Sequence, residues 1–265
     1  MSGRLFKFTN ALIVLAVFCA VLFASLPAAH AASQPLVIVE VFKEDKVHLD
    51  IGATTHVTRT LTIENEINQS VVPGIITLTL QKESPDKIGP IDIPFTSSVK
   101  AVNVTNVTAH MGDGTAINDV KVSEVNNSTV IQYGAWVPIG AGQSLTVVLE
   151  YDSPDIVDKG LLFNTVQYPF TSSSIPVEKA VVEANIDNGH VTYSSQSPSI
   201  NGSTYVWEKS QLGMDSWSAG FEYSILPLPI LPINGSMLLW GIIIIICLIW
   251  VVWTYTRPVK GPKKP

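Results

Sequence analysis

Ser144-Leu-Thr-Val-Val-Leu-Glu-Tyr151 alternates between two faces of an extended chain. Leu145, Val147 and Leu149 fall on one face, and the opposite face is more polar. The stretch Thr55–Glu64 repeats the pattern, with three aliphatic side chains on one face and threonines on the other. A period of two residues is typical of a β-strand with one buried and one solvated face, so the pattern predicts an all-β protein.

Runs of this kind recur from residue 36 to residue 225, and no convincing amphipathic helix interrupts them. Turn-forming residues separate the runs, among them Gly112-Asp-Gly114, Gly140-Ala-Gly142 and the hairpin-type pair Asn188-Gly189. Strands without intervening helices favour an antiparallel β-sandwich over βαβ units. We expect strands at Leu36–Phe42, Thr55–Glu64, Gly74–Leu80, Lys100–His110, Asn118–Val125, Thr129–Trp136, Ser144–Tyr151, Leu161–Gln167, Val177–Ile186, His190–Ser194, Ser203–Glu208 and Ser216–Ser224.

The polar, turn-rich stretch Asp152–Gly160 allows a domain boundary. We predict a β-sandwich over residues 32–152. Residues 153–226 form either a second sandwich or a continuation of the first. One large sandwich and two small ones both fit the strand pattern, which shows no clear internal repeat.

The N-terminal residues 1–31 have the features of a secretory signal peptide. Arg4 and Lys7 precede an apolar stretch over residues 11–24, and Ala29-His-Ala31 offers the small residues that signal peptidase accepts. We therefore predict cleavage after Ala31. An uncleaved N-terminal anchor is the alternative.

The C-terminal region predicts one transmembrane helix over residues 237–256. Met237–Thr254 contains 18 residues without a charge, close to the length that spans a hydrocarbon core of ~30 Å. The run of isoleucines would also suit a buried strand, but the stretch is too long for one. Aromatic residues mark both ends, as in a membrane-interface belt: Trp240 near one, and Trp250, Trp253 and Tyr255 near the other.

The charges that flank the helix predict its orientation. The segment 257–265 carries Arg257 and three lysines, which the positive-inside rule places in the cytosol. Residues 227–236 form a proline-rich juxtamembrane linker, in which Pro227, Pro229 and Pro232 favour an extended path of ~20 Å. The β-region is then extracellular or lumenal, in a cell membrane or an endoplasmic-reticulum-type membrane.

The β-region is acidic. Between Glu40 and Glu222 lie 22 acidic and 10 basic residues, a net charge of −12. This balance argues against nucleic acid and against an anionic membrane surface as the partner of the β-region. Solubility is its simplest explanation.

Neither of the two cysteines, Cys19 and Cys247, falls in the β-region, so no disulfide is expected there. Seven of the 13 asparagines begin an Asn-x-Ser/Thr sequon, and the excess predicts N-glycosylation of an exported surface. Many sequons without disulfides are what we expect of an archaeal surface protein. The predicted glycosylation sites are Asn68, Asn103, Asn106, Asn126, Asn127, Asn201 and Asn234.

The sequence contains no catalytic motif that we recognise, so we expect no enzymatic activity and no cofactor. None of the histidines of the β-region has metal-ligand spacing; these are His48, His56, His110 and His190. A hydrolase whose carboxylate pair the sequence does not reveal is an alternative. Solvated turns are the simplest reading of two acidic loops, although either could bind Ca²⁺: Asp113 with Asp119, and Asp152 with Asp155 and Asp158.

Three tryptophans, Trp136, Trp207 and Trp217, raise a further alternative. Exposed together, they would form an aromatic platform for a sugar ring. Tryptophan is also common in sandwich cores, which is the more economical reading.

Four segments occur in an order that resembles the lumenal β-domains of ribophorin I, a single-pass accessory subunit of oligosaccharyltransferase. They are Thr58–Glu66, Val137–Tyr151, Gln167–Thr171 and Pro176–Ala184. Signal peptide, β-domains and C-terminal helix also follow in the same order. The resemblance implies a non-catalytic scaffold beside a membrane glycosyltransferase, and it assigns no catalytic residues.

Together these features predict a membrane-tethered glycoprotein that acts as an interaction or accessory subunit of a protein complex in the same membrane. The lipid bilayer is its partner through the helix. A carbohydrate- or cell-wall-binding surface module is the alternative function.

Overall fold

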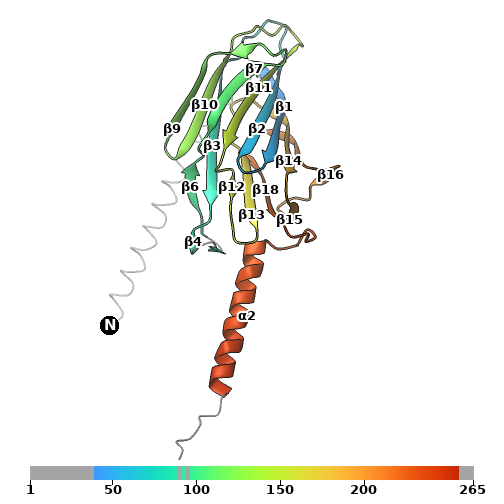
Figure 1. Cartoon of the computed structure of the whole chain (residues 1–265). Coiled ribbons are helices and arrows are strands. Elements are labelled where there is room, and N and C mark those ends of the chain that lie inside the picture. Colours follow the sequence, from blue (N-terminus) through green and yellow to red (C-terminus); the bar gives the residue numbers. More distant parts are fainter. Residues whose placement is uncertain (1–38, 89–90, 94–95, 257–265) are drawn as a thin grey trace, which may run out of the picture. The chain divides into compact units, whose positions relative to one another are not determined.

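The computed structural model describes residues 39–88, 91–93 and 96–256 (Figure 1). The chain divides into two compact units, Met1–Val37 and Ile38–Pro265. The first unit, with the predicted signal peptide and its cleavage site, lies outside the described residues, as does the basic segment 257–265.

Strands dominate the described residues, and one helix, α2 (Gly235–Thr256), follows them. The strands, in chain order, are β1 (Glu40–Ile51), β2 (Thr55–Asn65), β3 (Gly74–Ser84), β4 (Lys87–Ile88), β5 (Ile91–Asp92), β6 (Ser98–Ala101), β7 (Thr105–Met111), β8 (Ala116–Ile117), β9 (Val120–Val125), β10 (Ser128–Ala135), β11 (Ser144–Ser153), β12 (Val157–Asp158), β13 (Asn164–Phe170), β14 (Val177–Ile186), β15 (His190–Ser194), β16 (Ser199–Asn201), β17 (Thr204–Gly213) and β18 (Trp217–Ser224). The prediction of an all-β fold with one C-terminal apolar helix is confirmed.

The largest sheet has eight strands in the order β16-β17-β14-β1-β2-β11-β7-β8. Two four-stranded sheets, β6-β3-β10-β9 and β12-β13-β18-β15, and a short β4-β5 ribbon complete the described strands. The strand pairs are antiparallel, as predicted, with one exception: β1 and β14 run parallel, from Phe42 opposite Val177 to Ile51 opposite Ile186. The eight-stranded sheet therefore contains strands from both predicted segments, 32–152 and 153–226.

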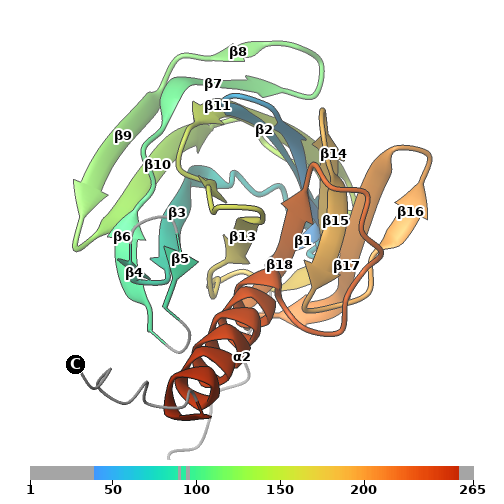
Figure 2. The ribbon, with the colours of Figure 1, turned by 60° about the horizontal axis from the view of Figure 1, so that its bottom comes forward.

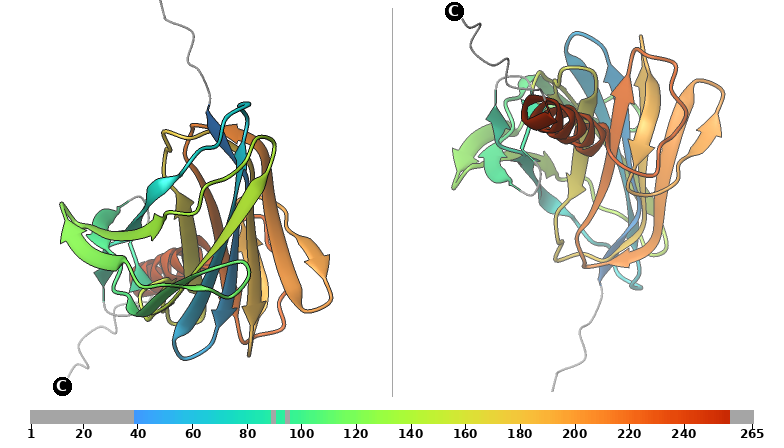
Figure 3. Two further views of the ribbon diagram at one scale, coloured as in Figure 1. Left: turned by 90° about the horizontal axis from the view of Figure 1, so that it is seen from above. Right: turned by 90° about the horizontal axis from the view of Figure 1, so that it is seen from below.

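The two four-stranded sheets cover one face of the eight-stranded sheet (Figure 2 and Figure 3). Side chains from the facing layers meet in a common core: Trp207 of β17 stacks on Phe221 of β18 with 4.4 Å between ring centroids. The alternation read from the sequence explains why these faces are apolar. Val147 and Leu149 of β11, on the predicted apolar face, are fully buried.

Helix α2 begins directly against the β-domain, and hydrogen bonds attach both the helix and the linker before it to that domain. The Gly235 N–H donates to the carboxylate of Glu222 in β18 over 2.5 Å, and the Leu231 N–H donates to the Thr192 carbonyl in β15 over 2.6 Å. The linker passes beside β15, and its residues Pro227–Ile230 line an open pocket together with Val191.

Only a glycine fits at the start of α2. A Cβ at position 235 would lie 2.2 Å from the ring of Phe163, which is buried. The side-chain oxygen of Asn234 accepts the N–H of Met237 over 2.8 Å and so caps the helix. Close packing and capping together fix where α2 starts.

Among the described residues, α2 is the one helix long and apolar enough to cross a membrane. Its apolar window, Met237–Thr254, has 18 residues, a mean hydropathy of 2.6 and no residue buried within the protein. At 1.5 Å per residue, the full helix is about 33 Å long, which matches the thickness of a hydrocarbon core.

Candidate functional site

The most unusual feature of the core is a buried ion pair between Asp45 of β1 and Arg59 of β2. Arg59 lies opposite Val47 in the β1–β2 register, so Asp45, two residues along, projects from the same face. The Arg59 Nε–H donates to Asp45 Oδ1 over 2.7 Å, and Nη2 donates to Oδ2. Asp45 is 1% exposed. The pair therefore has the bidentate geometry in which guanidinium binds carboxylate most strongly.

Arg59 keeps its charge despite its buried surroundings. Burial alone lowers the pKa of the Arg59 guanidinium, but the adjacent Asp45 carboxylate outweighs it, and the pKa lies well above its ordinary value. Three buried tyrosines lie close enough to interact electrostatically with this pair. Burial raises the pKa of Tyr133 to about 12 and raises those of Tyr151 and Tyr168 as well.

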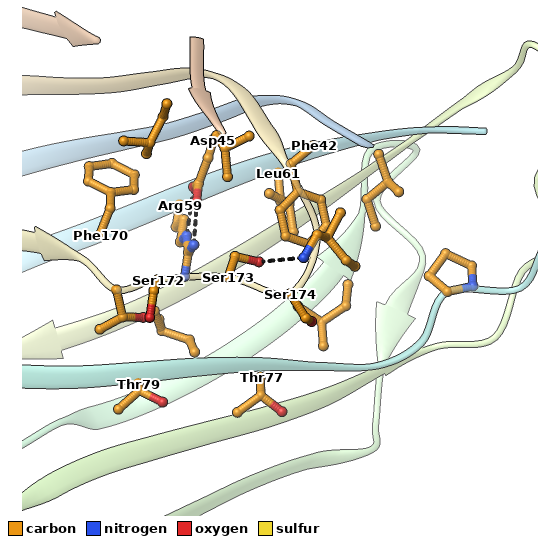
Figure 4. A pocket seen from close by; sticks show the side chains of 18 of the residues that line it. Phe42, Asp45, Arg59, Leu61, Thr77, Thr79, Phe170, Ser172, Ser173 and Ser174 are labelled. Carbon is orange, nitrogen blue, oxygen red and sulfur yellow. Dashed lines mark hydrogen bonds and ion pairs between the residues drawn. The ribbon is translucent and has the colours of Figure 1, made fainter. Parts of the chain in front are cut away.

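A pocket of about 300 Å³ opens beside this pair (Figure 4). Phe42, Leu61 and Phe170 supply apolar lining, and the segment Thr171–Ile175 after β13 forms one wall. The opposite wall is β3 at Ile75–Thr79, whereas β6 pairs with β3 only from Gln81 to Ser84. The pocket thus lies at the seam between the two four-stranded sheets.

Hydroxyl groups surround the entrance of the pocket (Figure 4); they belong to Thr77, Thr79, Ser172, Ser173 and Ser174. The Ser173 hydroxyl accepts the N–H of Ile175 over 3.1 Å, which holds that loop in shape. Because Asp45 neutralises Arg59, the site has no net charge. Its hydroxyls suit a neutral hydrogen-bonding group, and its volume is at the lower end of ligand pockets, roughly 300–1,000 Å³.

The predicted glycosylation sites differ in their surroundings. Six of them are exposed: Asn68, Asn103, Asn106, Asn126, Asn127 and Asn201. Asn234 is half-buried and caps α2. Exposure makes the six accessible to a glycosyltransferase, and their modification stays a prediction.

The acidic loops use their carboxylates within the protein. Hydrogen bonds from the backbone of Thr115 lower the pKa of Asp113, and those from the side chains of Asn106 and His56 lower the pKa of Asp152. Lys82 pairs with Asp158 over 2.8 Å and donates to the Asp155 carbonyl. Within the described ranges, no group of three or more His, Cys, Asp or Glu side chains is arranged to hold a metal ion.

The three tryptophans do not share one surface. Trp207 is 1% exposed, and its indole N–H donates to Ser194 Oγ over 2.8 Å. Trp217 is half-buried and stacks on Phe170. Trp136 is 57% exposed, and its indole N–H donates to Asp119 over 3.3 Å.

Trp136 packs against a glycine. A Cβ at Gly134 would come within 2.2 Å of the Trp136 indole nitrogen, so a larger residue at 134 would displace the ring. Trp136 is therefore a positioned, exposed aromatic side chain.

The Asp45–Arg59 pocket is not among the sites that the sequence predicts. One signal was present: the period of two places Arg59 on the same face as Val57, Leu61 and Ile63. A charged residue on an apolar face needs a buried partner, but nothing in the sequence alone identifies Asp45 as that partner.

No protein-family model matches the chain. A protein of Methanocaldococcus jannaschii, uncharacterized protein MJ1395, is 35% identical over 145 residues, which cover 52% of this chain and 96% of that protein. The chain belongs to the family of this archaeal protein.

Solved structures share only a distant likeness. A protein of Legionella pneumophila assigned as a nutrient binding protein has a TM-score of 0.45 and 11% identity, over 71% of this chain and 67% of that one. An M1 zinc metallopeptidase from Deinococcus radiodurans has a TM-score of 0.35 and 9% identity, over 71% of this chain and 42% of its own. At these scores neither likeness bears on function.

Asp45→Asn is expected to lower the free energy of unfolding by about 3–5 kcal/mol, because it leaves the buried guanidinium without its counter-charge. The double variant Asp45→Leu/Arg59→Met should recover most of this loss, since a buried pair replaced by apolar side chains is often neutral. Chemical unfolding in detergent, followed by tryptophan fluorescence, measures both.

Glu208→Gln is the matched control, because Glu208 pairs with Lys179 at the surface over 3.2 Å and should contribute less than about 1 kcal/mol. A double variant as unstable as Asp45→Asn would contradict the electrostatic explanation.

The buried tyrosines predict a loss of stability in alkali. In the folded state Tyr133 keeps its proton to about pH 12, whereas an unfolded tyrosine ionises near pH 10. Between these values the unfolded chain binds fewer protons, so the free energy of unfolding falls as pH rises, by about 1.4 kcal/mol per pH unit for each such tyrosine. Unfolding curves from pH 9 to 12 should show a shallower decline for Tyr133→Phe; an identical decline would refute the assignment.

Proposed function

We propose that the protein is a non-enzymatic, single-pass membrane glycoprotein that acts as an interaction or accessory subunit of a complex in the same membrane. The β-domain faces the cell exterior or the lumen, and the chain after α2 is cytosolic. The membrane is the cell membrane or one of endoplasmic-reticulum type. The observation that carries the proposal is the direct junction between α2 and the β-domain.

That junction places the β-domain beside any membrane that α2 crosses. The Gly235 N–H bonds to Glu222, which belongs to β18, so the start of the helix contacts the sheet although residues 225–234 lie between them in the chain. A protein held this close reaches the extramembrane parts of other proteins in the same membrane more readily than distant soluble ones. It would then act through lateral contacts with other proteins in the same membrane.

The resemblance to the lumenal domains of ribophorin I supports a complex such as oligosaccharyltransferase as the assembly. In that interpretation the β-domain acts as a scaffold, and catalysis belongs to a multi-pass partner. The sequons make the chain itself a substrate of such an enzyme.

The test is to tag the C-terminus, solubilise the membrane gently and identify by mass spectrometry what purifies with the chain. We expect a multi-pass protein in stoichiometric amount. A flexible Gly/Ser insertion after Ser224 should release it, because the insertion separates the β-domain from the bilayer. Recovery of the tagged chain alone in several mild detergents would count against an accessory role.

A carbohydrate-binding surface module is the second candidate, and Trp136 favours it. Its ring is exposed, packs against Gly134 and is hydrogen-bonded to Asp119, and an exposed, positioned aromatic ring can stack on a sugar ring.

If this candidate is correct, the chain binds surface polysaccharides on a glycan array, and Trp136→Ala abolishes the signal. Trp217→Phe serves as the control, because Trp217 is half-buried against Phe170. Equal binding by both variants would exclude Trp136 as the sugar platform.

A further inference from the structure

Apolar side chains are exposed around the start of α2. Six of them, each between 40% and 75% exposed, make up what we call the apolar rim: Leu161, Leu162, Ile225, Leu226, Ile230 and Ile233. Scattered exposed leucines are ordinary, but a contiguous apolar group at one end of a domain marks an interaction surface.

Hydrogen bonds and contacts join the two segments of the rim to each other and to the helix. The Ser224 hydroxyl donates to the Leu162 carbonyl over 2.7 Å, which joins the end of β18 to the loop before β13. Phe163, next in the chain, packs against Gly235, the first residue of α2. Figure 3 (right) shows α2 leaving the β-domain from this end.

The position along the helix sets the depth of the rim. The apolar window of α2 begins at Met237, two residues after Gly235, which is about 3 Å of helix. In a membrane that α2 crosses, the start of the helix, and the rim residues beside it, would therefore lie near the boundary between headgroups and acyl chains. Lys159, which is exposed two residues before Leu161, can extend its ammonium group toward lipid phosphates while its stem stays with the apolar side chains.

We propose that the apolar rim inserts into the interfacial layer of the bilayer that α2 crosses, so that lipid is its occupant. The inference rests on the membrane anchoring in the proposed function. A helix alone leaves a domain free to tilt and rotate about its attachment. The rim adds a second area of contact, which holds the β-domain at one height and orientation.

The test uses the full chain in nanodiscs, with Cys19→Ala and Cys247→Ala as the background and one new cysteine at a time labelled with a polarity-sensitive fluorophore. Leu162→Cys and Ile230→Cys report on the rim, and Ile245→Cys reports on the helix. Ile75→Cys is the matched control. Ile75 is 58% exposed near the start of β3, whereas Ser84, at the end of that strand, bonds to Asp158 near the rim. Nine residue-to-residue steps along the strand separate Ile75 from Ser84, about 30 Å.

Phosphatidylcholine with brominated acyl chains should quench the label at 162, 230 and 245, with emission shifted to shorter wavelength, and leave the label at 75 unchanged. Quenching at 245 without quenching at 162 and 230 overturns the insertion of the rim into the bilayer but leaves the membrane anchoring by α2 intact. A blue-shifted, unquenched rim label also overturns it, since protein rather than lipid then covers the rim. Absence of quenching at 245 overturns the anchor itself. Equal quenching at 75 shows that the domain lies flat on the membrane, against the fixed orientation proposed.

Discussion

Strand β1 forms backbone hydrogen bonds along both edges, with antiparallel β2 on one side and parallel β14 on the other. The second pairing joins the beginning of the β-region to a strand more than a hundred residues later. Strands β16 and β17 continue the sheet beyond β14, and β11, β7 and β8 continue it beyond β2. In the eight-stranded sheet, the β1–β14 pair is therefore the one that joins the strands of the two halves of the β-region, and neither half completes the sheet alone.

The ion pair joins this strand to β2, because Asp45 belongs to β1 and Arg59 to β2, and both line the pocket at the seam between the two smaller sheets. A core enclosed by three sheets includes sheet edges, and polar side chains occur at such an edge here. Asp45 and Arg59 satisfy each other, and the pocket gives the remaining hydroxyls access to solvent. A buried pair adds little net stability compared with apolar side chains, so its consequence is a polar pocket inside an otherwise apolar core.

Local pattern predicted much of the fold. The period of two located most strands and their buried faces, as at Val147 and Leu149. A strand with one buried face shows this period over a few neighbouring residues, so the local sequence is enough to detect it. The pairing of β1 with β14, and the Asp45–Arg59 pocket, join residues distant in sequence that no local pattern connects. The hydrogen bonds of Leu231 to Thr192 and of Gly235 to Glu222 are also non-local, and the prolines of the linker do not predict them.

The direct junction between α2 and β18 also has a mechanical consequence. Tension applied through the helix acts first on the hydrogen bonds of Gly235 and Leu231. Once these break, the force acts on the end of β18 at Ser224. β18 lies between β13 and β15, and pulling along the strand loads its hydrogen bonds to both neighbours at once. The two hydrogen bonds at the junction therefore break first, because they are few and are loaded before the strand. The linker can then extend before the strands of the sheet separate.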